Sequence, residues 1–85
     1  METEIIRLPE VSRTTGLARS TIYLRIEQGL LPKPVSLGGK AVGWPASEIS
    51  QINAARIAGK SNEEIKSLVD ELENQRGKER RTHHD

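Results

Sequence analysis

The sequence predicts a small, mostly helical domain that carries one β-hairpin and a C-terminal helix. Three observations support this prediction. Two short amphipathic segments are joined by a glycine within residues 8–29, a Gly-Gly pair separates two strand-like segments within residues 35–44, and two further segments with helical apolar spacing follow. The length of 85 residues, without cysteine, allows one small core and no disulfide framework. We expect a domain over residues 5–59, a helix over residues 61–76 and a disordered charged tail over residues 77–85.

Residues 8–29 have the pattern of a helix-turn-helix motif. Pro9 suits the first turn of a helix, because its missing N–H is not needed there. Gly16 allows the left-handed backbone of a tight turn, so that a second helix can cross the first steeply. Ser12 is small enough to lie where the two helices touch, and Gly29 is typical of the position that follows a helix. The apolar side chains expected to meet in one core are Val11, Leu17, Ile22 and Ile26.

The start of the second helix holds the candidate binding residues. Helical spacing turns Ser20, Thr21 and Leu24 outward and places Arg19 and Tyr23 on one flank. Free N–H groups at a helix start favour phosphate, while short hydroxyls and a guanidinium can reach base edges in a major groove. The alternative is a solvated helix end without a ligand. For Tyr23, packing beside the helix and a phosphate contact are equally expected, and Leu24 has no assigned partner.

Residues 35–44 predict a β-hairpin. Gly38-Gly39 can adopt the positive φ angles of a two-residue turn, which would pair Leu37 with Lys40. An isolated hairpin is marginal in water, so one face must pack against the helices. The residues expected on that face are Val35, Leu37, Val42 and Trp44. A hairpin beside a helix-turn-helix forms a wing, and the predicted fold class is therefore a winged helix-turn-helix. Lys40 would contact phosphate, or else be a solvated lysine at a turn.

Two more helices follow the hairpin. Residues 45–58 have helical spacing, and the apolar contacts expected of them are Ile49, Ile52 and Ile57. Ser61 and Glu64 form the S-x-x-E pattern of a capping box, which opens the last helix. The apolar stripe of that helix consists of Ile65, Leu68, Val69 and Leu72. The stripe either packs on its own domain or pairs with another copy, and we favour the first.

Charge is unevenly distributed along the chain. The net charge is only +1, but residues 7–44 hold six basic and two acidic side chains, whereas residues 61–85 hold five and seven. The basic excess coincides with the helix-turn-helix, as expected of a DNA-binding module. Arg25 and Lys33 belong to this region and are candidate phosphate contacts. For Arg25, methylenes laid along the edge of the core are equally expected.

The sequence has no pattern typical of catalysis or metal binding. It contains no phosphate-binding glycine loop and no H-E-x-x-H motif, and its histidines, His83 and His84, both lie in the terminal tail. We therefore expect neither an enzyme nor a cofactor or metal. No apolar run has membrane-spanning length and the N-terminus lacks a signal-peptide pattern, so a cytoplasmic protein is expected.

An ordered series of motifs resembles the AlpA family of prophage regulators, small winged-helix proteins related to excisionases and MerR-type DNA-binding domains. The motifs are L-A-R-S-T-I-Y from Leu17, E-Q-G from Glu27, P-K-P-V-S-L-G from Pro32, A-V-G-W from Ala41 and S-E-I from Ser47. The resemblance covers residues 7–58, and it implies that residues 19–23 belong to the recognition helix and Lys40 to the wing. Ala18 departs from the usual serine N-cap, which would weaken the helix start by about 1 kcal/mol.

The residues and the resemblance together imply a regulator of a prophage or other mobile element. It would bind double-stranded DNA with the second helix in the major groove and the wing on the backbone. Several copies on one site are expected, with RNA polymerase or an integrase as a partner. One alternative is an excisionase that bends attachment-site DNA. Another, of a different class, is a protein-interaction module that uses the last helix.

Overall fold

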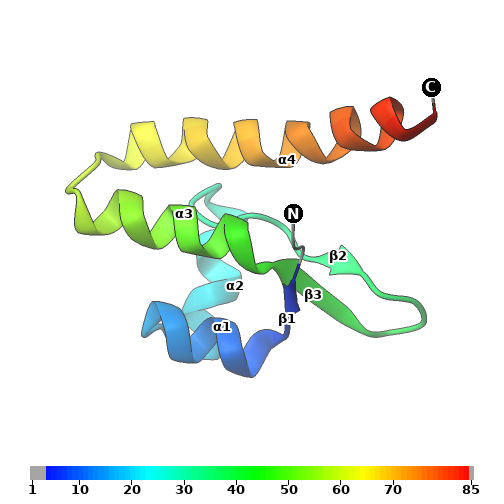
Figure 1. Ribbon diagram of the computed structural model, residues 1–85. Helices are drawn as coiled ribbons and strands as arrows, with labels where there is room; N and C mark the ends of the chain where they lie inside the picture. Colours follow the sequence, from blue (N-terminus) through cyan, green and yellow to red (C-terminus); the bar gives the residue numbers. More distant parts are fainter. Residues whose placement is uncertain (1–3, 85) are drawn as a thin grey trace.

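The computed structural model describes residues 4–84, with side chains described through residue 76. The elements are β1 (Ile5–Ile6), α1 (Leu8–Thr15), α2 (Arg19–Glu27), β2 (Val35–Ser36), β3 (Val42–Pro45), α3 (Ala46–Ile57) and α4 (Asn62–His84). The strands form an antiparallel sheet in the order β1-β3-β2. In Figure 1, α4 runs alongside α3, α1 lies below α3, and the β2–β3 hairpin projects from the helices. The fold is the predicted winged helix-turn-helix with an added helix.

Side chains of α1 build the turn that leads into α2. Gly16 has a φ of 75°, and its N–H donates to the carbonyl of Ser12 at 2.9 Å. The Ser12 hydroxyl donates to the carbonyl oxygen of Leu17 at 2.7 Å, so this residue bonds to the turn in addition to being small. Thr15 Oγ1 donates to the carbonyl of Val11 at 2.7 Å and accepts from the Leu17 N–H at 3.3 Å. These bonds fix the direction in which α2 leaves α1.

The predicted helix ends are confirmed where local sequence signals set them. Gly29 has a φ of 79°, and the Leu30 N–H donates to the Arg25 carbonyl at 2.8 Å, which is the pattern of a glycine-terminated helix. The capping box of α4 forms in both directions. The Ser61 N–H donates to Glu64 Oε1 at 2.9 Å, and the Glu64 N–H donates to Ser61 Oγ at 3.2 Å.

One cluster of buried apolar side chains joins the helices to the sheet. Its members are Ile6, Val11, Ile22, Leu30, Leu31, Trp44, Ile49, Ile52, Ile65 and Val69. Leu68 and Leu72 pack against this cluster, so the apolar stripe of α4 lies on its own domain, and this prediction is confirmed. The stripe is therefore covered by the chain itself and is not exposed for binding another protein, as the protein-interaction alternative requires.

The hairpin differs from the prediction by one residue of register. Ser36 pairs with Val42, and the Leu37 N–H donates to the Ala41 carbonyl at 2.8 Å, so the loop has three residues, 38–40. A shift of one residue reverses the faces of a strand. Val35 and Leu37 therefore lie on the face opposite Val42 and Trp44, and the expectation of one shared apolar face is wrong.

Gly43 gives the physical reason for this register. A Cβ at Gly43 would lie 2.5 Å from Ile5 Cγ2 and 3.2 Å from Leu37 Cδ1, because both side chains occupy the space above this glycine. Trp44, on the other face, pairs with Ile6 and is fully buried. The observed register gives Leu37 the bare backbone of Gly43 to pack on.

The helices differ from the sequence predictions in two places, at Ile57 and at the end of α4. Ile57 is 87% exposed instead of contacting the core, because five helical residues carry it about 140° around the axis from Ile52. Helix α4 continues to His84, beyond the end near residue 76 that the sequence predicts, and the predicted disorder of residues 77–85 stays a prediction. Lys, Glu and Arg are good helix formers, and a helix already held by a packed stripe extends through them at little cost.

Candidate nucleic-acid interface

The first turn of α2 presents backbone N–H groups to solvent. Its N-cap residue, Ala18, makes no side-chain hydrogen bond, as the sequence predicts. Among the groups that the structure describes, none accepts a hydrogen bond from the N–H of Arg19, Ser20 or Thr21. Arg19 and Ser20 are exposed and Thr21 is half-buried. Such an end carries partial positive charge, and it suits an anion that can accept from several N–H groups.

The core fixes which face of α2 looks outward. Ile22 is fully buried and Ile26 half-buried on the inner side of the helix. Tyr23 is 43% exposed and Leu24 is 50% exposed. The predicted orientation is therefore confirmed for Ile22, Ser20 and Leu24, whereas Thr21, which was expected to point outward, is half-buried. Contact of these residues with DNA stays a prediction.

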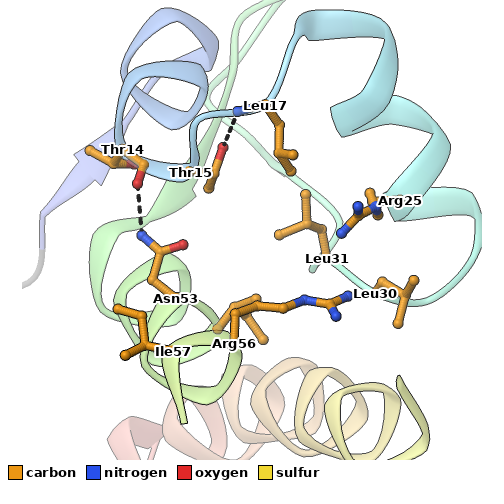
Figure 2. Close-up of a pocket in the computed structure, with 10 residues that line it drawn as sticks. Thr14, Thr15, Leu17, Arg25, Leu30, Leu31, Asn53, Arg56 and Ile57 are labelled. Carbon is orange, nitrogen blue, oxygen red and sulfur yellow. Dashed lines mark hydrogen bonds between the residues drawn. The ribbon is translucent and has the colours of Figure 1, made fainter. Parts of the chain in front are cut away.

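Arg25 lies apart from the outward residues of α2. It is half-buried and lines a groove of about 430 Å³ between the helix-turn-helix and α3. Figure 2 shows Arg25 and Arg56 extending along this groove beside Leu31. Of the two expectations for Arg25, the structure favours methylenes along the edge of the core. Its contact with phosphate stays a prediction.

Lys40 stands at the tip of the wing. It is exposed in the three-residue loop, together with Gly38 and Gly39, whose φ angles are 102° and 57°. A Cβ at either glycine would meet no atom within 4 Å, so the loop has open space around it. The hairpin extends away from the helices in Figure 1. The tip is therefore accessible to a large ligand.

Lys33 has an exposed side chain but a tightly held backbone. Its N–H donates to Glu73 Oε2 at 2.8 Å, and its carbonyl accepts from Arg76 Nη2 at 2.8 Å. The Arg76 guanidinium also makes two bonds to the carboxylate of Glu48, at 3.0 and 2.6 Å. The side chain of Glu48 is only 8% exposed.

Sequence reasoning missed the residues that hold this backbone. The sequence offered one clue to these residues. Helical spacing puts the charged Glu48 on the same side of its helix as the apolar Ile52. A charge on an apolar face is rarely buried unless it is paired. That spacing predicts a buried ion pair, although it does not name Arg76 as the partner.

Metal-binding clusters and membrane-spanning helices are both absent from the residues that the structure describes. No group of three or more His, Cys, Asp or Glu side chains is placed to hold a metal ion within the described part of the chain. The side chains of His83 and His84 lie outside the described residues. No helix described in the structure is both long and apolar enough to span a membrane.

Comparisons with known proteins point to prophage regulation. The family model described as prophage CP4-57 regulatory protein (AlpA) matches residues 4–57. A protein of Enterobacteria phage P4, given as uncharacterized protein ORF88, is 53% identical over 55 residues, which are 65% of this chain and 62% of that protein. The DNA-binding transcriptional activator AlpA of Escherichia coli K12 is 42% identical over 53 residues, covering 55% of this chain and 76% of its own.

The matched region has defined limits. The chain covers less than two thirds of the phage P4 protein, and the family match ends at residue 57, before α4 begins. No solved structure gives a significant match.

Proposed function

Because the chain belongs to the prophage CP4-57 regulatory protein (AlpA) family, we propose that it regulates transcription of a mobile element by binding a specific DNA site. Helix α2 enters the major groove, and the wing lies against the sugar-phosphate backbone. The E. coli relative is described as a DNA-binding transcriptional activator. Activation is accordingly the first expectation for this chain, with RNA polymerase as a partner on the DNA.

The observation that carries the proposal is the open N-terminus of α2. Its first N–H groups have no acceptor within the described residues, and Arg19 and Ser20 lie exposed beside them. A phosphate would accept from the N–H groups, while the Arg19 guanidinium suits the two acceptors of a guanine edge. The turn built by Ser12 and Thr15 holds this helix start in a fixed direction. DNA binding therefore costs little conformational entropy at this helix.

The wing and the basic region support the same proposal. Lys40 at the loop tip is exposed, and the flanking glycines leave no bulk that would keep a phosphate away. Residues 7–44 carry the basic excess of the chain. One module of this size makes few phosphate contacts, so tight binding needs two or more copies on repeated sites.

The proposal is tested by footprinting and mobility shift on DNA from the neighbourhood of the chain's own coding sequence. Arg19→Ala should weaken binding to the footprinted site about tenfold or more and reduce discrimination against mutated sites, because it removes a base contact. Lys40→Ala should weaken binding to all sequences similarly and lower the salt dependence by about one counterion.

Arg13→Gln is the matched control. It removes one positive charge from an exposed pair with Glu10 on α1, at 2.7 Å, and it should leave site preference unchanged. If Arg19→Ala and Lys40→Ala both bind like the unmodified chain, the assigned surface is wrong.

Excisionase activity would use the same surface, and it is the second candidate that the family resemblance implies. It predicts cooperative binding to clustered sites in an attachment region and excision with purified integrase. The regulator proposal predicts a promoter site and altered transcription without integrase.

A further inference from the structure

The segment that joins α2 to the wing makes no strand pairing of its own, and other elements hold it. Trp44 Nε1 donates to the carbonyl of Pro32 at 2.9 Å. Glu73 accepts from the N–H of Lys33, and Arg76 donates to the carbonyl of Lys33, each at 2.8 Å. Two of these three bonds come from α4.

The Arg76 side chain is itself fixed by Glu48. Its guanidinium bonds to both carboxylate oxygens of Glu48, in the first turn of α3, which directly follows β3. A bidentate guanidinium–carboxylate pair has a defined geometry that a lysine does not reproduce. Arg76 therefore links three places: α4, the first turn of α3 that follows β3, and the linker that precedes β2.

We propose that α4 is a positioning element for DNA binding, in which Arg76 and Glu73 hold the backbone of Lys33 and thereby set the wing relative to α2. This inference rests on the proposed function. The elements assigned to DNA contact lie within residues 4–57, which match the family, whereas Arg76 and Glu73 lie beyond that match. A segment beyond the family match, α4, thus positions the proposed DNA-binding surface within it.

The charge of Glu73 makes the proposal distinguishable from a general electrostatic effect. Glu73→Ala removes a negative charge, so electrostatics alone predicts tighter binding to DNA. Loss of the acceptor for the Lys33 N–H, in contrast, frees the linker and predicts weaker binding. The two explanations therefore differ in sign.

The test uses the full chain and its footprinted DNA site, in a binding titration over a range of salt concentrations. Arg76→Gln and Glu73→Ala should each weaken binding about tenfold and lower the salt dependence by about one counterion, the same change as Lys40→Ala. In a Lys40→Ala background both effects should nearly vanish, because the wing contact is already lost. Additive effects in that background would overturn the positioning role. Lys60→Gln, an exposed charge on the α3–α4 connection, is the control and should show no such coupling.

A second measurement keeps the proposal falsifiable if a variant is poorly stable. The chain has no cysteine, so spin labels can be placed at Gln28→Cys and Lys40→Cys alone. The distance distribution between α2 and the wing should broaden in Glu73→Ala, measured without DNA at a temperature where the chain is folded. An unchanged distribution with unchanged binding overturns the positioning role and leaves the proposed function intact. Failure of the unmodified chain to bind its site overturns both.

Discussion

The N-termini of α2 and α4 differ in how their first N–H groups are satisfied. At α4, Ser61 and Glu64 form a reciprocal capping box. At α2, the N-cap is Ala18 without a side-chain bond, the first turn holds no acidic residue, and Arg19 adds a positive charge there. A positive charge at a helix start opposes the helix dipole. The α4 start is therefore arranged for stability, whereas the α2 start leaves its N–H groups open to an anion.

The largest expected losses of stability come from removing the buried isoleucine in the first turn of α2 or of α4. Ile22 and Ile65 are both fully buried, each three residues after the first residue of its helix. Ile22→Ala and Ile65→Ala should each lower the free energy of unfolding by about 2–5 kcal/mol, measured by urea denaturation. If alanine unfolds the chain at the outset, valine at either position should cost about 1 kcal/mol. A much smaller loss at Ile65 than at Ile22 would mean that α4 is only loosely packed on the domain. The α4 start would then not be arranged for stability, in contrast to what its capping box indicates.

The caps themselves should respond in opposite directions. Ser61→Ala should lower the free energy of unfolding by about 1 kcal/mol, because an N–H of α4 loses its acceptor. Ala18→Ser should raise it by a similar amount, because α2 gains the cap that it lacks. Thermal unfolding of both variants measures the difference. No gain in stability from Ala18→Ser would mean that the first N–H groups of α2 are already satisfied in solution.

Local signals made much of this structure predictable from the sequence. Glycines at the ends of α2 and α3 have positive φ angles, and Ser61 and Glu64 form the expected box. Each of these features depends on residues within one helical turn of one another. The inner side of α2 was predictable from Ile22 and Ile26, which are four residues apart and so lie on one side of the helix.

Contacts between distant residues decided the rest. The hairpin register depends on Ile5 and Leu37 filling the space over Gly43, and no local rule couples a two-residue strand to that glycine. The bonds from Arg76 to Glu48 and to Lys33 cross 28 and 43 positions of the chain. Spacing along a sequence does not specify such partners, so the sequence predicted the outward side chains of α2 but not the residues that hold the linker before the wing.

The smallest expected effect is the pH dependence of the α4 cap. The pKa of Glu64 is lowered from its ordinary value of 4.5 by the hydrogen bond from the Ser61 N–H, then by the Ser61 side chain, and then by the charge of Lys60. Because the pKa is lower in the folded chain, the stabilisation from Glu64 is fully present above pH 4.5 and is lost as the pH falls through the folded-state value.

Glu64→Gln removes this titration while keeping an oxygen acceptor for the Ser61 N–H. The difference in unfolding free energy between the unmodified chain and Glu64→Gln should therefore be largest near neutral pH and should shrink below pH 4.5. Urea denaturation at several pH values measures it. Arg19→Gln supplies the contrast at the other helix start, because no titrating carboxylate caps α2, and its effect on stability should be the same at every pH in this range. A pH-independent difference for Glu64→Gln would mean that the α4 start gains nothing from its carboxylate, which removes the electrostatic part of the contrast with α2.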